Sequence, residues 1–426
     1  MQNSVNNPAE FLCRVMKRIY DRQLTTLTGG NLSMMDENGV MWVTPTEIDK
    51  GGLVPEDIVR VYPDGHFEGK HRPTSEYRIH WRIMQEHPEF RAVAHAHSPA
   101  IVTMSVLHEP TDTRLLLQAH EAIGEVELAE YGMPGTVKLV ECVADTFEKG
   151  CDAAILKNHA AFLAARGDLN DAYRRFEMLD LVSNIELNAL ALGQLQALSA
   201  DQFDAYRASI KAYALSEERG MAEKEAGIRS ELVEIGTRAY TRRFFCGMFG
   251  SISARVDEHS FLINRKDADR GQLCETDFVR IEGDTCYGAT PDDLTALHQA
   301  IYEANPEINS VILAAPAYLT AFAICERPYD VTLIPESYGV LRDVVEIPFD
   351  EMLHGASGIA ERMSLKKPFA IMRNLGSLVV GPDIKLTFDK LEVAEFTAIS
   401  LYQAAQTGKT IVPMDDEMRK EQDACS

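Results

Sequence analysis

Long hydrophobic runs, disulfide-like cysteine patterns and an excess of positive charge are all missing from this sequence. No window approaches the roughly 18 uninterrupted apolar residues of a membrane span, so no membrane helix is expected. The segment Met1–Pro8 has neither a basic start nor an apolar stretch, which predicts that there is no signal peptide. The formal net charge of −23 argues against a surface for nucleic acid or anionic membranes, because phosphates are held by clustered Lys and Arg.

The cysteines indicate a reducing compartment. The chain has eight of them, with no Cys-x-x-Cys spacing and without the density of a disulfide-stapled protein. We therefore expect reduced, mostly buried cysteines in a cytoplasmic protein. They are Cys13, Cys142, Cys151, Cys246, Cys274, Cys286, Cys325 and Cys425.

An internal repeat organises the chain. The 426 residues, 46% of them hydrophobic, suffice for two domains of about 100–200 residues each. The segment Arg18–Ser33, RIYDRQLTTLTGGNLS, aligns with Arg238–Ser253, RAYTRRFFCGMFGSIS. The match continues downstream, so one domain is written twice. Leu53–Arg60 faces Leu273–Arg280, and Ile155–His159 faces Ile371–Leu375.

Each copy has the pattern of an α/β domain, with an opening helix, a glycine-containing turn, and short strands alternating with helices. In the first copy, apolar residues at helical spacing predict a helix over about Pro8–Arg22. The charged, alanine-rich stretch Ala200–Lys224 predicts a solvated helical connector. We place the boundary near residue 215, which gives domains 1–215 and 216–426.

The most informative segment of the first copy contains His95 and His97. Side chains alternate along a strand, so both imidazoles are expected on one face together with Val93, opposite a face of alanines. Two imidazoles on one face can form half of a zinc site. The same pair is also compatible with two ordinary histidines at the edge of a sheet.

A third histidine and a carboxylate can complete such a site. His159 follows the apolar, strand-like run Ala153–Leu156, where a lone histidine is usually just a strand-end residue. Glu76 lies in the first turn of a predicted helix, where helix capping alone also explains a carboxylate. Taken together, three nitrogen ligands leave the fourth zinc position open for water or substrate, with Glu76 as the proton-transfer group.

Several small polar residues suit an anion. The turn Thr28–Ser33 contains Gly-Gly-Asn and offers backbone N–H groups, while Thr44 and Thr46 supply hydroxyls. Thr74 and Ser75 stand at a predicted helix N-terminus, where anions bind readily. Each feature alone is explained as a turn or a cap. Because they recur beside the histidines, they predict an anion-binding pocket.

As a set, these motifs resemble the class II aldolase/adducin family, whose members include fuculose-phosphate aldolase, rhamnulose-phosphate aldolase and ribulose-phosphate 4-epimerase. The likeness covers most of the first copy. It implies two tandem class II aldolase-like α/β/α domains, each a central, mostly antiparallel sheet flanked by helices. The motifs that carry it are Thr28–Ser33, Val43–Thr46, Pro73–His80, His95–Pro99 and Lys157–His159.

The resemblance implies that His95, His97 and His159 hold Zn²⁺, or another divalent metal in its place. Glu76 would then be the acid/base and, in the empty site, a fourth metal contact. The metal would chelate a ketose carbonyl and a neighbouring hydroxyl, and would stabilise the enediolate formed as a carbon–carbon bond breaks. The resemblance also implies that a sugar or dihydroxyacetone phosphate is held around Gly30, Asn31, Thr44, Thr46, Thr74 and Ser75.

The expected function is therefore that of a metal-dependent aldehyde-lyase, a class II aldolase acting on a small sugar, a sugar phosphate or a hydroxy-keto acid. The family's epimerases carry Asp in place of Glu76, which favours an aldolase. Glu47 departs from the pattern, because the aldolases usually have Gly after Thr-Pro-Thr, and a carboxylate beside the pocket leaves phosphorylation of the substrate open. The alternatives are an epimerase, dehydratase or decarboxylase with the same metal cradle, and a non-catalytic adducin-like assembly protein.

The second copy lacks the three histidines and the carboxylate of the first. This predicts that it is metal-free and retains the fold without the reaction. Leu313, Ala315, Leu375 and Leu294 stand in place of His95, His97, His159 and Glu76; Ser251 replaces Asn31, and Asn264–Lys266 replaces Thr44–Thr46.

The resemblance also implies an oligomer, since the family's sites lie in clefts between neighbouring subunits of a cyclic tetramer. A chain with two fused copies would build the same ring as a homodimer, a pseudo-tetramer of alternating active and inactive units. The second copy would then supply the far wall of the pocket. The expected partners are a small carbohydrate and a second copy of the chain.

Overall fold

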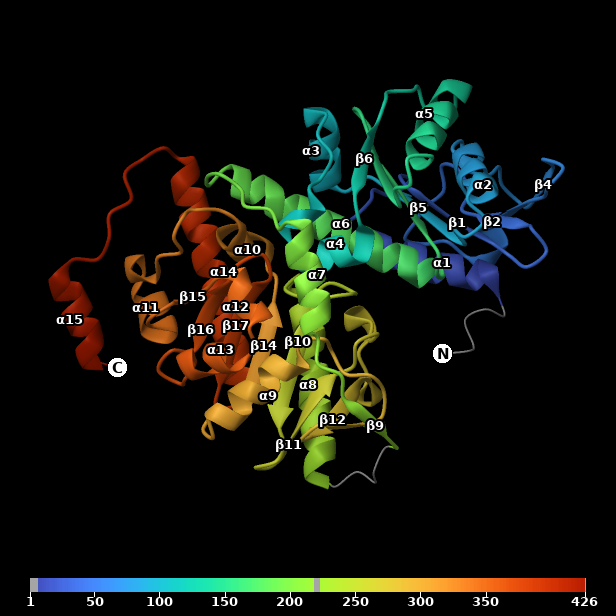
Figure 1. The fold of residues 1–426 in the computed structure, drawn as a ribbon. Coiled ribbons are helices and arrows are strands. Elements are labelled where there is room, and N and C mark those ends of the chain that lie inside the picture. Colours follow the sequence, from blue (N-terminus) through green and yellow to red (C-terminus); the bar gives the residue numbers. More distant parts are fainter. Residues whose placement is uncertain (1–6, 218–222, 426) are drawn as a thin grey trace. The chain divides into compact units, whose positions relative to one another are not determined.

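The computed structural model describes residues 7–217 and 223–425 (Figure 1). The chain forms two compact units, one of Met1–Thr113 with Ala119–Asn184 and the other of Arg114–Gln118 with Ile185–Ser426. The division falls earlier than the expected boundary near residue 215. Residues before 215 already contact the second unit. The Gln196 N–H donates to the Ile324 carbonyl, and the Gln202 amide donates to Asp350.

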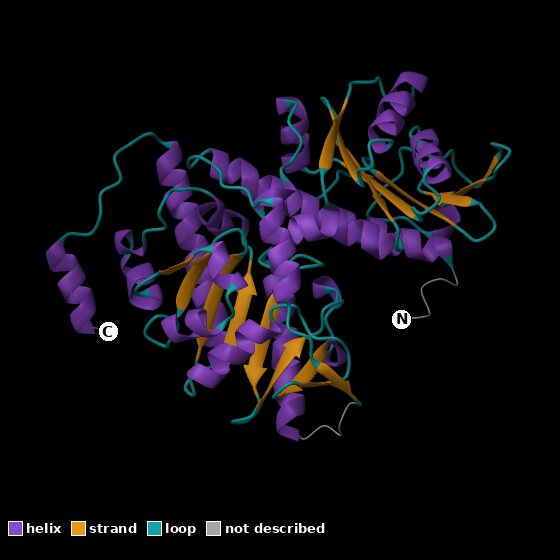
Figure 2. Cartoon of the chain, viewed as in Figure 1, coloured by secondary structure: helices purple, strands orange, loops and turns teal. Residues whose placement is uncertain are grey.

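The sheet of the first unit has eight strands in the order β4-β3-β2-β1-β5-β8-β7-β6 (Figure 2). Every neighbouring pair is antiparallel except β6 and β7, which run parallel. This confirms the predicted mostly antiparallel sheet. The strands are β1 (Asn31–Met35), β2 (Met41–Val43), β3 (Val59–Val61), β4 (Phe67–Glu68), β5 (Ala92–Ala96), β6 (Val126–Ala129), β7 (Ala153–Leu156) and β8 (Ala161–Ala165).

Helices flank this sheet. The first, α1 (Pro8–Asp21), begins after Asn7, whose side chain accepts from the Glu10 N–H, and its apolar stripe is buried as the helical spacing predicts. On one face, α2 and α5 pack over a core that includes Val93 of β5 and Phe162 of β8. The remaining helices are α2 (Tyr77–Glu86), α3 (Pro99–Leu107), α4 (Leu117–Ile123), α5 (Val137–Phe147) and α6 (Leu169–Leu190).

The second unit repeats this architecture, which confirms the tandem α/β fold. Its strand order β13-β12-β11-β10-β14-β17-β16-β15 follows that of the first sheet strand for strand, and β9 is added beside β13. The strands are β9 (Ala214–Ser216), β10 (Ser251–Arg255), β11 (Ser260–Asn264), β12 (Phe278–Glu282), β13 (Thr285–Tyr287), β14 (Ser310–Ala314), β15 (Val345–Ile347), β16 (Phe369–Met372) and β17 (Gly376–Gly381).

The helices of the second unit follow the same plan. The longest, α14, is the counterpart of α6 and contacts β14 and β17. They are α7 (Ala200–Ser209), α8 (Glu223–Thr241), α9 (Thr295–Ala304), α10 (Ala317–Ile324), α11 (Pro335–Leu341), α12 (Phe349–Leu353), α13 (Ser357–Arg362), α14 (Ile384–Gln406) and α15 (Asp416–Cys425).

The predicted helical connector Ala200–Lys224 is wrong as a continuous helix. Helix α7 ends at Ser209, and the chain then forms β9, which pairs in parallel with β13. Pairing with an open sheet edge satisfies the backbone N–H and C=O groups of β9, which helical propensity does not take into account. Residues 218–222 of the connector lie outside the described part, and α8 begins at Glu223.

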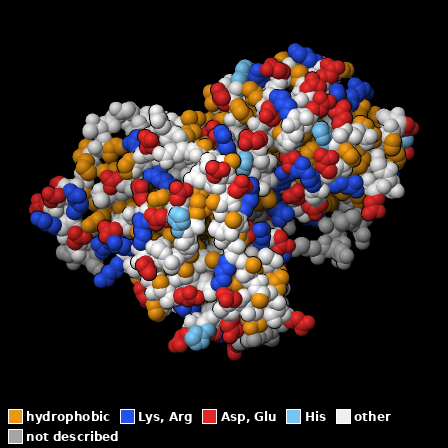
Figure 3. Space-filling model, viewed as in Figure 1, with side chains coloured by type: hydrophobic (Ala, Val, Ile, Leu, Met, Phe, Trp, Pro, Cys, Tyr) orange, Lys and Arg blue, Asp and Glu red, His pale blue; other side chains and the backbone are white. Residues whose placement is uncertain are grey.

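The surface carries charges of both signs. Acidic and basic side chains are interspersed over the face visible in Figure 3. Of the helices in the described ranges, none is long and apolar enough to cross a lipid bilayer. Cys13, Cys142, Cys151, Cys246, Cys274, Cys286 and Cys325 are free thiols.

Candidate active site

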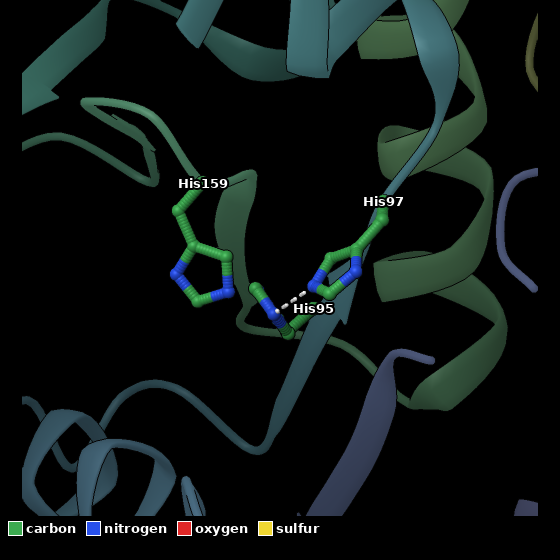
Figure 4. Close-up of side chains that lie close together, drawn as sticks. All are labelled: His95, His97 and His159. Carbon is green, nitrogen blue, oxygen red and sulfur yellow. Dashed lines mark hydrogen bonds between the residues drawn. The ribbon is translucent and has the colours of Figure 1, made fainter. Parts of the chain in front are cut away.

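Three histidines of the first unit come together where β5 ends. His95 lies on β5, His97 follows the strand, and His159 lies in the turn between β7 and β8 (Figure 4). Their rings point toward one another, and one ligand atom of each lies within 4.8 Å of the others. The Nε2 atoms of His95 and His97 are 2.9 Å apart. The arrangement fits one ion held by three imidazoles.

The surroundings keep these imidazoles in the neutral form that binds metals. Burial lowers the pKa of all three, that of His95 well below its usual value. His95 Nδ1 lies 2.9 Å from the Ala161 carbonyl, so Nδ1–H donates and the lone pair of Nε2 faces the cluster. His159 Nδ1 is buried and has no hydrogen-bond partner among the described residues. Neutral nitrogen donors suit zinc and the neighbouring transition metals.

Glu76 lies beside the histidines instead of capping its helix. It is the N-cap residue of α2, but its side chain makes no capping hydrogen bond, so such a bond does not account for its position. Its Oε2 lies 3.3 Å from His95 Nε2, and its Oε1 lies 3.6 Å from His159 Nε2. The Asn31 amide donates to Oε2 at 2.8 Å. A buried carboxylate held in this way can carry a proton at the edge of the histidine cluster.

A buried histidine close to Glu76 was not among the predicted site residues. His80 lies one turn further along α2, 2.7 Å from the Ser33 hydroxyl and 2.5 Å from the Asn31 amide oxygen. A signal was available, because a histidine four residues after Glu76 lies on the same helix face and recurs in the second copy as His298.

The glycine-rich turn packs directly against the histidine strand. Gly30 has a φ of 69°, and a Cβ there would lie 2.9 Å from the His95 carbonyl oxygen. Only glycine meets both requirements without strain. Asn31 begins β1 and pairs with His95, and its side chain is engaged with Glu76 and His80. Anion binding at Gly30 and Asn31 stays a prediction.

The other predicted anion-binding residues lie on two segments that contact each other. The Thr74 N–H donates to the Thr44 carbonyl at 3.2 Å, which joins the two segments. The Thr44 hydroxyl is fully buried and accepts from the Leu32 N–H, so its role in the structure is to hold β1. Thr46 is half-buried and Ser75 is exposed.

A buried lysine under this region was not among the predicted site residues. Lys50 is 1% exposed, and its ammonium donates to the Pro45 carbonyl at 2.5 Å. Burial lowers its pKa to about 8. Among the residues that the structure describes, no carboxylate lies within ion-pair distance of it. Among those residues, the Lys50 ammonium is therefore stabilised by the Pro45 carbonyl and by no carboxylate.

Strand register confirms the alignment of the two copies. Asn31 pairs with His95 in the first sheet, and Ser251 pairs with Leu313 in the second. Glu76 and Leu294 are both N-cap residues, of α2 and α9. Asn158 and Asn374, with φ values of 59° and 57°, precede His159 and Leu375. Apolar side chains therefore stand at the site positions of the second copy.

In the second copy, an ion pair lies at the positions that correspond to Lys50 and Thr74. Arg270 stands at the position of Lys50, and its guanidinium donates to Asp292 at 2.7 Å and to the Gly250 carbonyl at 3.0 Å. Asp292 replaces Thr74, as its N–H donates to the Asn264 carbonyl just as that of Thr74 donates to Thr44. In the described part of the first copy, Lys50 has no carboxylate that corresponds to Asp292.

Comparison with known proteins matches both copies to one family. The family model for the Class II Aldolase and Adducin N-terminal domain matches residues 10–187 and again 230–401. L-fuculose phosphate aldolase of Methanococcus maripaludis is 32% identical over 179 residues, 41% of this chain and 93% of that protein. 5-methylthioribulose-1-phosphate/5-deoxyribulose-1-phosphate aldolase of Rhodospirillum rubrum is 27% identical over 197 residues, 45% and 88% of the two chains. 3-oxo-tetronate 4-phosphate decarboxylase of Escherichia coli is 26% identical over 176 residues, 40% and 82%.

Proposed function

Since this chain belongs to the class II aldolase and adducin family, we propose that its first copy is the catalytic half of a metal-dependent aldehyde-lyase. The observation that carries the proposal is the position of Glu76, whose two carboxylate oxygens face His95 and His159. The reaction breaks or forms a carbon–carbon bond in a small sugar phosphate or hydroxy-keto acid.

His95, His97 and His159 would hold the ion, zinc in the first instance. When bound, such an ion supplies Lewis-acid polarisation of carbonyl and hydroxyl oxygens. Glu76 takes up or returns a proton at its carboxylate, and the Asn31 amide keeps Oε2 in place. Burial of this carboxylate excludes bulk water from the proton-transfer step.

We further propose that the substrate is phosphorylated, as the names of all three relatives indicate for those proteins. The phosphate would be contacted by Gly30, Asn31, Thr46, Thr74 and Ser75. Thr44 would keep β1 in position beside them. Lys50 supplies positive charge beneath them, where the second copy has a closed ion pair. Replacing Lys50 by Met is expected to raise KM for a phosphorylated substrate and to leave kcat nearly unchanged, because a charge felt equally throughout the reaction contributes uniform binding.

The test uses the zinc-loaded protein with L-fuculose 1-phosphate and 5-methylthioribulose 1-phosphate, and measures release of a free aldehyde. Glu76→Gln is expected to lower kcat by about 100- to 10,000-fold, as general acid–base catalysis contributes about that much. Glu47→Gln, the matched change at an exposed carboxylate, should leave kcat unchanged. His95→Ala should lose the metal, which is expected at about one ion per chain. A metal-free wild type, or a fully active Glu76→Gln variant, would refute the enzyme proposal.

A decarboxylase is the second candidate, and the relative from Escherichia coli favours it. Release of CO₂ from 3-oxo-tetronate 4-phosphate, without any free aldehyde from the ketose phosphates, would establish this reaction instead. An epimerase would convert a ketose phosphate with release of neither product, and a dehydratase would release only water. An adducin-like assembly protein would show none of these reactions.

A homo-oligomer remains part of the proposal, as a dimer that closes a pseudo-tetrameric ring. Light scattering coupled to size exclusion should then give twice the chain mass of 47.5 kDa, and a monomer would exclude the ring. Cytoplasmic location stays a prediction, supported by the free thiols of the described cysteines.

A further inference from the structure

We propose that His80 is a positioning residue that holds the Asn31 amide in place with its nitrogen toward Glu76. The proposal rests on the proposed function of Glu76 and adds to it a residue that contacts neither the histidine cluster nor a substrate. It concerns four side chains in one chain of hydrogen bonds, from Ser33 through His80 and Asn31 to Glu76.

The direction of each hydrogen bond follows from chemistry. A carboxylate only accepts, so the amide nitrogen of Asn31 donates to Glu76 Oε2 at 2.8 Å. The amide oxygen of Asn31 therefore faces His80 Nε2 at 2.5 Å, and Nε2–H must donate to it. His80 Nδ1 then carries the lone pair and accepts from the Ser33 hydroxyl at 2.7 Å. Glu76 thus sets the orientation of the Asn31 amide, the His80 Nε2–H holds the other end of that amide, and the Ser33 hydroxyl satisfies the remaining lone pair of His80.

Burial holds His80 in the form that this chain of bonds requires. The side chain is fully buried, and burial lowers its pKa to about 3. It therefore remains neutral at physiological pH, with one ring nitrogen donating and the other accepting. A protonated ring would have no lone pair for Ser33 to donate to.

The second copy separates a positioning role from simple core filling. His298 is fully buried at the same place on α9, and its Nδ1 lies 2.7 Å from the Ser253 hydroxyl. Its Nε2, however, has no hydrogen-bond partner among the described residues. Ser251 stands there in place of Asn31, and Leu294 in place of Glu76. The second copy therefore keeps the pair of histidine and serine without a hydrogen bond at Nε2. The hydrogen bond at Nε2 is present in the first copy, which also has Glu76.

Loss of the Nε2 donor has a specific consequence. Without this partner the amide oxygen of Asn31 is a buried acceptor with no donor, and the side chain is expected to move toward another donor. Glu76 would then lose the hydrogen bond from the Asn31 amide and its fixed position. Proton transfer should suffer most, because it depends directly on Glu76. Substrate binding should change little, because Asn31 is one of five residues that would contact the phosphate and the other four keep their places.

The experiment compares His80→Leu, His80→Gln and the matched variant His298→Leu in the zinc-loaded protein. The probe is dihydroxyacetone phosphate in deuterated water, and the readout is deuterium incorporation next to the carbonyl, which needs the acid/base but no aldehyde partner. His80→Leu is expected to lower kcat about 10- to 100-fold with little change in KM, as the loss of a hydrogen-bond partner behind the reacting groups does in metal sites. His80→Gln, which restores an N–H donor, should recover most of the rate. His298→Leu removes the same serine contact in the other copy and should leave exchange unchanged.

Crystal structures of the His80→Leu and His80→Gln variants provide a readout that does not depend on activity. The Asn31 side chain should leave Glu76 in the first and keep its hydrogen bond in the second. The proposal is overturned if His80→Leu exchanges at the wild-type rate, if His298→Leu is equally impaired, or if Asn31 stays in place in His80→Leu. Failure of the wild type to exchange would count against the proposed function, and the Asn31 position would then decide on His80 by itself.

Discussion

At the scale of single residues, Glu47 shows how backbone conformation explains a departure in sequence. It has a φ of 55° and an exposed side chain. That conformation favours glycine, the residue that the aldolases of this family usually carry here. The sequence alone predicted a conflict between a carboxylate and an anion, whereas the structure adds a conflict between a side chain and its own backbone.

Glu47→Gly is therefore expected to stabilise the first unit by about 0.5–1 kcal/mol. Relief of the left-handed conformation returns about 1–2 kcal/mol, and the added flexibility of glycine costs about 0.5–1 kcal/mol. Urea denaturation measures the difference. Glu37→Gly, at an exposed turn residue outside the positive-φ group, should give no gain. A loss of stability in Glu47→Gly would contradict the strain argument.

The buried histidines predict how stability depends on pH. Burial lowers the pKa of both His80 and His298 from 6.5 to about 3. Between these values the unfolded chain binds protons that the folded chain does not, so stability is lost as pH falls from 6.5 toward 3. Each histidine contributes a slope of up to about 1.4 kcal/mol per pH unit. His298→Leu should thus lose less stability than the wild type between pH 7 and pH 5 in urea denaturation, and equal losses would refute this.

At the scale of elements, the sequence predicted those helices and strands whose conformation depends on residues close together in the sequence. The apolar spacing of α1 and the alternation that places Val93 and His95 on one face of β5 are both confirmed. The prediction that the helix continues after α7 was wrong, because that segment forms β9 by pairing with β13, which is distant in sequence. His80 was missed for a similar reason, since its partners Asn31 and Ser33 come from another element.

Proline substitution tests the strand β9 directly. The Ala214 N–H donates to the Asp284 carbonyl at 2.9 Å, so Ala214→Pro removes one bond at the start of the strand. The expected cost is about 1 kcal/mol, because the acceptor at this exposed edge can still bond to water. Ala212→Pro, outside the strand, is the matched control for the loss of chain flexibility. Equal effects of the two prolines on the urea midpoint would contradict the pairing.

At the scale of the whole molecule, one fold is present in two chemical states. The second copy keeps the strand order, the register and the left-handed asparagine of the first, but it has leucine or alanine at the positions of the three histidines and Glu76. Where the first copy has the predicted anion-binding residues, it has the ion pair of Arg270 and Asp292. The sequence repeat predicted the loss of the ligands, but the ion pair depends on contacts between separate loops, which sequence spacing does not give.

The difference between the copies predicts that zinc stabilises only one of them. An ion that binds the folded state at 100 times its dissociation constant adds about 2.7 kcal/mol to the stability of the unit that holds it. Hydrogen exchange followed by mass spectrometry should show zinc-dependent protection in peptides covering β5 and the turn around His159. Peptides covering β14 and the turn around Leu375 have no imidazole at the corresponding positions and should be unaffected, and His95→Ala should abolish the effect. Equal protection of both copies, or protection that survives in His95→Ala, would show that the three histidines are not the ligands.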